Sequence, residues 1–141
     1  LPGGDALRGK AVFRGPKAGC SICHSMAYHG GQFGPDLTRI GQVRKKMDLL
    51  EAIVFPSASF VRSYETMQVS MGGGDVLAGI IRDQGAGHVS LGISPEKTTR
   101  IERGNIRNIE PLNISLMPAG MDQVLTLQQL GDLIAYLEAS R

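Results

Sequence analysis

The sequence predicts a mainly α domain into which a small antiparallel β-sheet is inserted, α+β overall. Two observations support this prediction. Helical patterns of apolar residues occur near both ends of the 141-residue chain and again near residue 50, so we expect three or more helices. Residues 60–111 instead alternate apolar and polar side chains between glycine-rich turns, as in a β-meander. We therefore interpret 1–141 as a single domain that contains a β-rich insertion over 60–111.

The first helix is expected from Ala6 to about Arg14. Asp5 is a plausible N-cap, and Gly15-Pro16 ends the helical pattern. Gly9 falls in the middle of this helix, where glycine costs about 1 kcal/mol relative to alanine. Such a glycine is either simply tolerated on an exposed surface or required by the close approach of another backbone.

The next stretch, Cys20-Ser21-Ile22-Cys23-His24, is a CxxCH motif, the signature of covalent haem attachment. Two thiols three positions apart on one helical turn can each add to a vinyl group of the same macrocycle. The adjacent His24 then lies beneath the iron as proximal ligand. The sequence therefore predicts one haem c, attached through Cys20 and Cys23, with His24 on the metal.

Two other interpretations of the cysteines have less support. A redox disulfide in a thioredoxin-like setting requires a strand-helix-strand pattern, which does not surround Cys20 and Cys23. A structural zinc site needs four ligands, and these are the only two cysteines. His24 or His29 and the distant His88 would have to complete it, so the haem interpretation is preferred.

A second helix is expected from Met47 to Val54, with an apolar face formed by Leu49, Leu50, Ile53 and Val54. Asp48 lies in its first turn and Pro56 ends it. The preceding run Arg44-Lys45-Lys46 is most simply a solvated surface. It could instead face a haem propionate or an acidic partner.

From Ser57 onward the pattern changes to strands. Gly72-Gly73-Gly74-Asp75 and Gln84-Gly85-Ala86-Gly87 mark turns. The expected strands are Met67–Met71, Val76–Ile81, Val89–Ile93, Thr98–Ile101 and a short piece Ile106–Ile109. The chain then returns to helix. Thr126 and Gln129 fit the N-cap and N3 positions of a capping box, and the apolar face that follows comprises Leu130, Leu133, Ile134 and Leu137.

The order of these motifs resembles class I c-type cytochromes. More closely, it resembles the planctomycete and verrucomicrobial haem-binding domain, a cytochrome c with β-structure inserted before the methionine ligand. The matching residues are Asp5, Cys20, Cys23, His24, Gly34 to Leu37, Ile40-Gly41, Pro56-Ser57, Tyr64-Glu65, Ser115 to Pro118, Asp132-Leu133 and Tyr136-Leu137. The resemblance implies a mainly α cytochrome c fold with its helices around one haem. It also implies that Leu133 and Tyr136 of the last helix cross the first helix at Gly9 and Phe13.

The resemblance assigns roles to two further residues. The backbone carbonyl of Pro35 would accept the ring N–H of His24, and the thioether of Met117 would take the sixth coordination position of the iron. Without the resemblance, Gly34-Pro35-Asp36 is only a turn and a lone methionine is usually core filler. Met121, four residues beyond Met117, is the closest rival ligand.

These assignments predict a monohaem electron carrier that is not an enzyme by itself. With His24 and Met117 both on the iron, the haem can pass one electron but offers no open site for a substrate. The competing hypothesis is a haem-based gas sensor or catalytic haem, with Met117 absent or labile. A bis-histidine carrier would have to use His29, on the same loop as His24, or His88 in the β-rich insertion.

Charge and hydropathy limit the partners. Fifteen basic and 13 acidic residues give a net charge of only +2, so we expect no nucleic acid. No run of 18 apolar residues occurs, so we expect no membrane insertion of this fragment. Leu1-Pro2-Gly3-Gly4 is interpreted as the end of a linker. We expect a periplasmic or otherwise extracytoplasmic location and a redox protein or fused dehydrogenase domain as partner. A homodimer through the β insertion is a further hypothesis.

Overall fold

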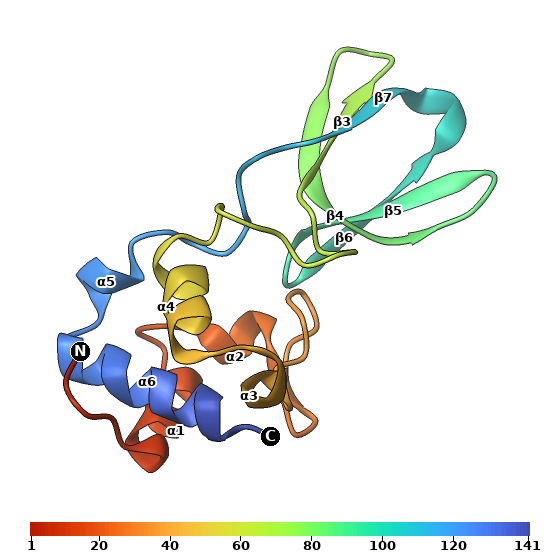
Figure 1. The fold of residues 1–141 in the computed structure, drawn as a ribbon. Coiled ribbons are helices and arrows are strands. Elements are labelled where there is room, and N and C mark those ends of the chain that lie inside the picture. The colour runs from red at the N-terminus through yellow and green to blue at the C-terminus, as the bar shows by residue number, and fades with distance from the viewer. The chain divides into compact units, whose positions relative to one another are not determined.

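The computed structural model describes residues 1–141 (Figure 1). The chain forms two compact units. Residues Leu1–Ser59 together with Met117–Arg141 make up the first, here called the helical unit, and Phe60–Leu116 make up the second, called the sheet unit. Each unit has its own cluster of buried apolar side chains.

The structure is α+β, and the prediction of a mainly α cytochrome c fold is wrong. Only three helices exceed one turn: α1 (Ala6–Arg14), α4 (Lys46–Val54) and α6 (Leu127–Ala139). The others have four residues each: α2 (Cys20–Cys23), α3 (Ile40–Val43) and α5 (Met121–Val124). A five-stranded and a two-stranded antiparallel sheet accompany them. The helices stay short because extended or left-handed residues flank them, such as Gly19 and Gly120. No helix combines the length and the apolar character needed to span a membrane.

Helices α1 and α6 pack across each other and begin as the sequence predicts. Asp5 caps α1 by accepting a hydrogen bond from the backbone N–H of Arg8 (2.9 Å), and Thr126 and Gln129 form the expected capping box of α6. At the crossing, Gly9 lies against the backbone carbonyl of Asp132, where a Cβ atom would collide with it. The mid-helix glycine is therefore required by close backbone packing.

Aromatic and aliphatic side chains fill the space beside this crossing. The rings of Phe13 and Tyr136 lie 5.6 Å apart between centroids, tilted by 59°, and Leu133 is buried. This confirms the contact expected between the first and last helices. The buried core of the helical unit comprises Phe13, Met26, Leu49, Ile53, Leu125, Leu130, Leu133, Ile134 and Leu137.

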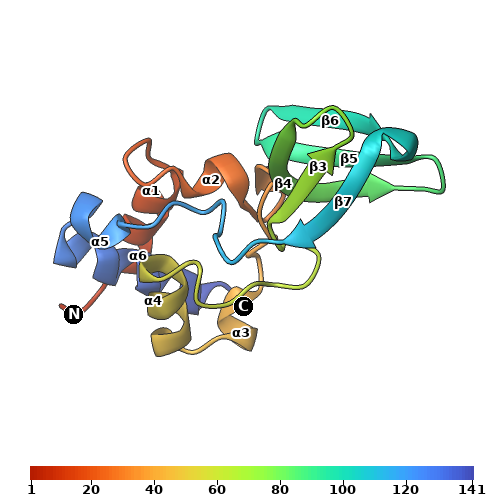
Figure 2. The same ribbon diagram turned by 90° about the horizontal axis from the view of Figure 1, so that it is seen from above.

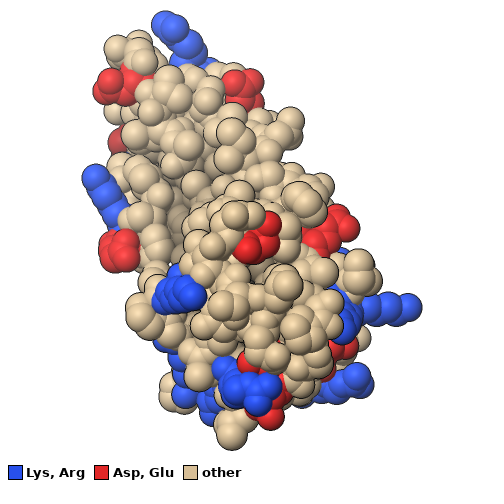
Figure 3. Space-filling view, turned by 90° about the vertical axis from the view of Figure 1, so that its left-hand side faces the viewer, with Lys and Arg blue, Asp and Glu red and all other residues tan.

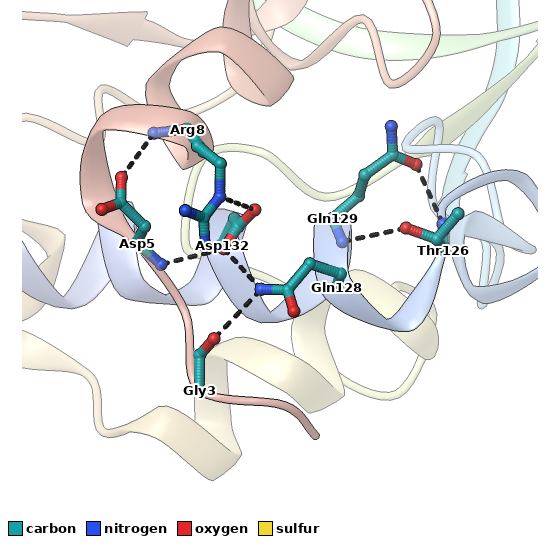
Figure 4. Close-up of polar contacts among 7 residues, drawn as sticks. All are labelled: Gly3, Asp5, Arg8, Thr126, Gln128, Gln129 and Asp132. Carbon is teal, nitrogen blue, oxygen red and sulfur yellow. Dashed lines mark hydrogen bonds and ion pairs between the residues drawn. The ribbon is translucent and has the colours of Figure 1, made fainter.

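A buried carboxylate joins the same two helices (Figure 4). Asp132 in α6 accepts hydrogen bonds from the backbone N–H of Asp5 (2.8 Å), from Nε of Arg8 (2.9 Å) and from the side-chain amide of Gln128 (2.9 Å). The hydrogen bond from Arg8 is the main cause that lowers the pKa of Asp132 to about 2. The start of the chain is thereby tied to the last helix.

The sheet unit contains the five predicted strands, each within a few residues of its expected bounds. They are β3 (Met67–Met71), β4 (Val76–Gln84), β5 (His88–Ser94), β6 (Lys97–Glu102) and β7 (Ile106–Pro111). The order across the sheet is β6-β5-β4-β3-β7, and Figure 2 shows β3 between β4 and β7. A single 3-10 turn, Arg103–Asn105, separates β6 from β7. Val69, Leu91 and Ile101 form the buried core of this unit.

Because β7 returns to pair with β3, the two ends of the sheet unit lie together. Met67 pairs with Pro111, and one residue beyond on each strand the backbone N–H of Leu112 donates to the carbonyl of Thr66 (2.9 Å). The register shifts once in each of the β3–β7, β4–β5 and β5–β6 pairs, which allows the sheet to coil.

Candidate functional site

The two cysteines lie at the first and last positions of α2. Gly19 precedes this turn in the left-handed conformation (φ 66°), which glycine adopts at little cost. The backbone N–H of His24 donates to the carbonyl of Cys20 (2.9 Å) and closes the turn. Both thiols and the imidazole therefore belong to one helical turn, the arrangement that the CxxCH spacing predicts.

Burial raises the pKa of the Cys20 thiol to about 11. The raised pKa disfavours the thiolate that attacks a disulfide. In addition, no group of three or more His, Cys, Asp or Glu side chains is arranged to hold a metal ion. The geometry therefore offers no support for the zinc or the redox-disulfide interpretation.

The imidazole of His24 is fixed by the backbone of Pro35, whose carbonyl oxygen lies 2.7 Å from Nδ1. A carbonyl oxygen only accepts hydrogen bonds, so Nδ1 carries the proton and Nε2 has a lone pair for a metal. Burial lowers the pKa of His24, and the hydrogen bond to Pro35 opposes this effect in part. Because the effect of burial is the larger, the pKa of His24 lies below its ordinary value, which favours the neutral, ligand-competent imidazole at pH 7.

The loop that carries Pro35 is itself braced. Asp36 accepts hydrogen bonds from the hydroxyl of Ser25 (2.8 Å) and from the backbone N–H of Thr38 (2.7 Å), and hydrogen bonds from Thr38 and Ser25 lower its pKa. Gly34 packs closely against the imidazole of His24. A Cβ atom at this position would lie only 2.6 Å from Cε1 of the ring. The loop therefore fits the ring of His24 closely and fixes its orientation.

Between His24 and this loop lies a two-stranded hairpin that sequence reasoning missed. It consists of β1 (Ser25–Met26) and β2 (His29–Gly30), and its two turn residues, Ala27 and Tyr28, have φ values of 50° and 70°. Hairpin turns with two positive φ values favour Asn-Gly or Gly-Gly. The dipeptide Ala-Tyr carries no such signal, so the sequence offered no reason to expect a turn there.

Met117 lies in the segment that precedes α5. It is half-buried and packs against the apolar cluster of the helical unit, as do Cys20 and Met121. Met47 is 69% exposed, and Met67 and Met71 belong to the sheet unit. Met26, Met117 and Met121 therefore all lie in the apolar cluster of the helical unit, and the structure does not show which thioether would bind a metal.

The other two histidines are placed differently. His88 in β5 has its Nε2 2.8 Å from Oδ2 of Asp83, and this contact lowers the pKa of Asp83. His29 is exposed in β2. Neither is held in an apolar setting, so the structure gives no argument for a bis-histidine site.

The residues present fit a covalently bound haem by their chemistry. Two thiols on one turn are the groups that tether a haem c, and an imidazole and a thioether are the protein ligands that its iron takes. A small open depression elsewhere in the helical unit is lined by Ala11, Val12, Gly15, Lys17, Leu125 and Gln129. None of the predicted site residues lines it, so we do not identify it with the site.

Comparison with known proteins adds no assignment. No protein-family model matches the chain, and the search of curated proteins found no significant match.

Proposed function

We propose that this chain is a monohaem c-type cytochrome that carries single electrons and is not itself an enzyme. Haem c would be attached through Cys20 and Cys23, with His24 as proximal ligand. The observation that carries the proposal is the 2.7 Å hydrogen bond between Nδ1 of His24 and the carbonyl of Pro35. Histidine ligands of metals almost always donate their second ring N–H in this way.

The chain's own residues have distinct tasks in this proposal. When bound, haem supplies the reversible one-electron chemistry of its iron. Cys20 and Cys23 would tether the macrocycle, and Pro35 holds the ring of His24 in one tautomer while Gly34 leaves room for it. Met117 would be the second protein ligand of the iron, which would leave no open position for small molecules and would raise the reduction potential relative to two nitrogen ligands.

The proposed setting is extracytoplasmic, because covalent haem attachment normally takes place outside the cytoplasm. The partner would be a redox protein or a dehydrogenase domain fused to or acting with this chain. The sheet unit has two edge strands, β6 and β7, either of which could pair with a second copy. Sedimentation that shows only monomer at high concentration would contradict this dimer.

The test is the optical spectrum of protein produced together with a haem-attachment system. We expect a low-spin c-type spectrum with the weak ferric iron–thioether band. It should remain unchanged by carbon monoxide in the wild type and become sensitive to it in Met117→Ala. Met121→Ala is the matched control and should behave like the wild type. If Met121→Ala loses the band while Met117→Ala keeps it, then Met121 is the ligand.

Two results would contradict the proposal. Protein that carries no covalent haem, or whose His24→Ala variant has an unaltered spectrum, would remove the cytochrome assignment. A high-spin wild-type spectrum that responds readily to carbon monoxide would indicate an open distal site. The gas-sensor or catalytic hypothesis would then replace that of an electron carrier.

A further inference from the structure

The loop from Gly31 to Thr38, here called the Pro35 loop, is fastened to the CxxCH turn and to the strand that follows it. Three hydrogen bonds between backbone groups make this attachment: from Gly31 to Ser21 (2.9 Å), from Gly34 to Cys23 (2.8 Å) and from Leu37 to Ser25 (2.9 Å). They lie on both sides of Pro35, but none of them involves the peptide group that joins Pro35 to Asp36. The direction of the Pro35 carbonyl therefore depends on other contacts.

Asp36 makes such contacts with both of its carboxylate oxygens. Oδ2 accepts a hydrogen bond from the hydroxyl of Ser25 in β1 (2.8 Å), and Oδ1 accepts one from the backbone N–H of Thr38 (2.7 Å). The hydroxyl of Thr38 in turn accepts a hydrogen bond from the backbone N–H of Ala27 (2.8 Å). The carboxylate thus joins the Pro35 loop to β1, although Asp36 itself is exposed.

The position of Asp36 bears directly on the neighbouring carbonyl. The carbonyl of Pro35 and the N–H of Asp36 belong to one planar peptide group, and the pyrrolidine ring fixes the φ angle of Pro35. Once Asp36 is held, this peptide group has little freedom to rotate. Its carbonyl oxygen lies 2.7 Å from Nδ1 of His24. The contacts of Asp36 therefore influence how firmly the imidazole is held.

Asp36 also brings a negative charge to the candidate site. Hydrogen bonds from Thr38 and Ser25 hold its pKa below the ordinary value of 3.8, so the carboxyl group is ionised at neutral pH. A negative charge favours the ferric state of a haem iron, which carries one more positive charge than the ferrous state. A well-formed hydrogen bond at Nδ1 raises the basicity of the imidazole and acts in the same direction. Both effects lower the reduction potential.

We propose that Asp36 positions the carbonyl of Pro35 on Nδ1 of His24. It does so through its two hydrogen bonds, and it thereby fixes the tautomer of the imidazole and lowers the reduction potential of the site. This inference rests on the proposed function, because the potential is that of a haem held by His24. A simpler role for Asp36 is to close the turn to Thr38, as aspartate commonly does. The bond from Ser25 goes beyond turn closure, because it joins the loop to β1.

The test compares variants of the haem-loaded chain by two measurements. Redox titration gives the reduction potential, and ¹⁵N NMR of the ferrous protein gives the rate at which the Nδ1 proton of His24 exchanges with water. Asp36→Ala removes both hydrogen bonds and the charge. It should raise the potential most and make this exchange roughly tenfold faster. Ser25→Ala removes one hydrogen bond and keeps the charge, so both changes should be smaller and in the same direction.

Asp36→Asn is the conservative variant that separates position from charge. Its amide oxygen can accept from Thr38 and its amide nitrogen can donate to the hydroxyl of Ser25, so the exchange rate should stay at the wild-type value. The potential should still rise, but by less than in Asp36→Ala. This rise should shrink in about 1 M salt, because an exposed charge is screened. Glu51→Gln, which neutralises an exposed carboxylate in α4, is the control and should leave the exchange rate unchanged.

Two results would overturn the inference. Asp36→Ala that lowers the melting temperature but keeps the wild-type potential and exchange rate would show that Asp36 only closes a turn. Asp36→Asn that speeds the exchange as much as Asp36→Ala would show that its hydrogen bonds do not hold the ring. If Asp36→Ala fails to fold, Ser25→Ala decides, because it removes a single hydroxyl. Wild type without covalent haem would refute the proposed function, whereas haem-loaded wild type with unaltered variants would refute only this inference.

Discussion

At the scale of single residues, Asp132 shows how one carboxylate can join the two ends of a chain. It is buried and accepts hydrogen bonds from Asp5, Arg8 and Gln128. Its pKa in the folded protein is about 2, below its ordinary value of 3.8, chiefly because of the hydrogen bond from Arg8. The ionised form therefore stabilises the fold above pH 3.8, and this contribution is lost as the pH falls through about 2.

We predict that Asp132→Asn lowers the urea midpoint of unfolding at pH 6. The neutral amide of asparagine cannot form the ion pair that the carboxylate of Asp132 forms with Arg8. The difference from the wild type should shrink as the pH approaches 2, where the wild-type carboxyl is itself half protonated. Asp83→Asn is the control, since it alters an exposed carboxylate. It should have a smaller effect at pH 6. A deficit of Asp132→Asn that stays constant with pH would contradict the assignment.

Gly34 is a second residue whose role can be isolated. Alanine there would bring Cβ to 2.6 Å from Cε1 and 2.8 Å from Nδ1 of His24. We expect Gly34→Ala to displace the ring, lengthen the hydrogen bond to Pro35, lower the melting temperature and alter the spectrum of the haem-loaded protein. Gly73→Ala in the β3–β4 turn, where a Cβ would meet nothing within 4 Å, is the control. If Gly34→Ala and Gly73→Ala had the same melting temperature and the same spectrum, Gly34 would not be needed to position the ring of His24.

At the scale of elements, the crossing of α1 and α6 depends on the absence of one side chain. The Cβ of an alanine at position 9 would collide with the backbone carbonyl of Asp132. We predict that Gly9→Ala destabilises the protein by at least about 2 kcal/mol, since backbone has to move and the favourable helix propensity of alanine is too small to compensate. Chemical unfolding measures this. Gly3→Ala is the control and should hardly change the free energy of unfolding, because a Cβ at Gly3 meets no atom within 4 Å. If Gly9→Ala stabilised the protein, the close packing of α1 on α6 would be contradicted.

The long helices could be predicted because their ends carry local signals. Asp5 and Thr126 cap α1 and α6 through bonds made within four residues. The glycine-rich turns and the alternation of apolar and polar residues were sufficient to predict all five strands of the sheet unit. The prediction of a mainly α fold was wrong because α2, α3 and α5 have only four residues each. Helices this short contain too few residues to show a helical pattern of apolar side chains. The β1–β2 hairpin escaped notice because its turn, Ala27-Tyr28, contradicts the usual turn preference.

Some features of the candidate site could also be predicted from local sequence, and others could not. The positions of Cys20, Cys23 and His24 on one turn follow from their spacing alone. The contact between His24 and Pro35 spans 11 residues, and only the resemblance to class I cytochromes suggested it. Whether Met117 or Met121 would face the iron depends on tertiary packing, which spacing does not encode. The exposure of Tyr28 in the neighbouring hairpin likewise follows from the three-dimensional structure and not from the sequence.

At the scale of the whole molecule, the two units have separate cores. Phe13 and Leu133 belong to one, and Val69 and Leu91 to the other. On the face drawn in Figure 3, acidic and basic side chains are interspersed. The net charge of +2 is therefore not gathered into one patch on that face. Because the cores are separate, we expect the stability of each unit to depend on its own buried residues.

We predict that the units lose stability independently. Leu91→Ala, at a fully buried position, should cost about 2–5 kcal/mol within the sheet unit. It should accelerate amide hydrogen exchange in β3–β7 while leaving α1 and α6 protected. Leu133→Ala is the matched change in the helical unit and should have the reverse effect. Simultaneous loss of protection in both units from either variant would show that they unfold as one cooperative structure.

The pairing of β3 with β7 bears on how such a chain could have arisen. The sheet unit begins and ends at neighbouring backbone positions, joined by the hydrogen bond between Leu112 and Thr66. A unit whose two ends lie close together can be inserted into a surface loop of another domain without disrupting the fold of that domain. The two loop residues that flank the insertion stay as close to each other as they were before. The same geometry would allow the sheet unit to be exchanged or deleted in descendants of this gene, independently of the CxxCH motif in the helical unit.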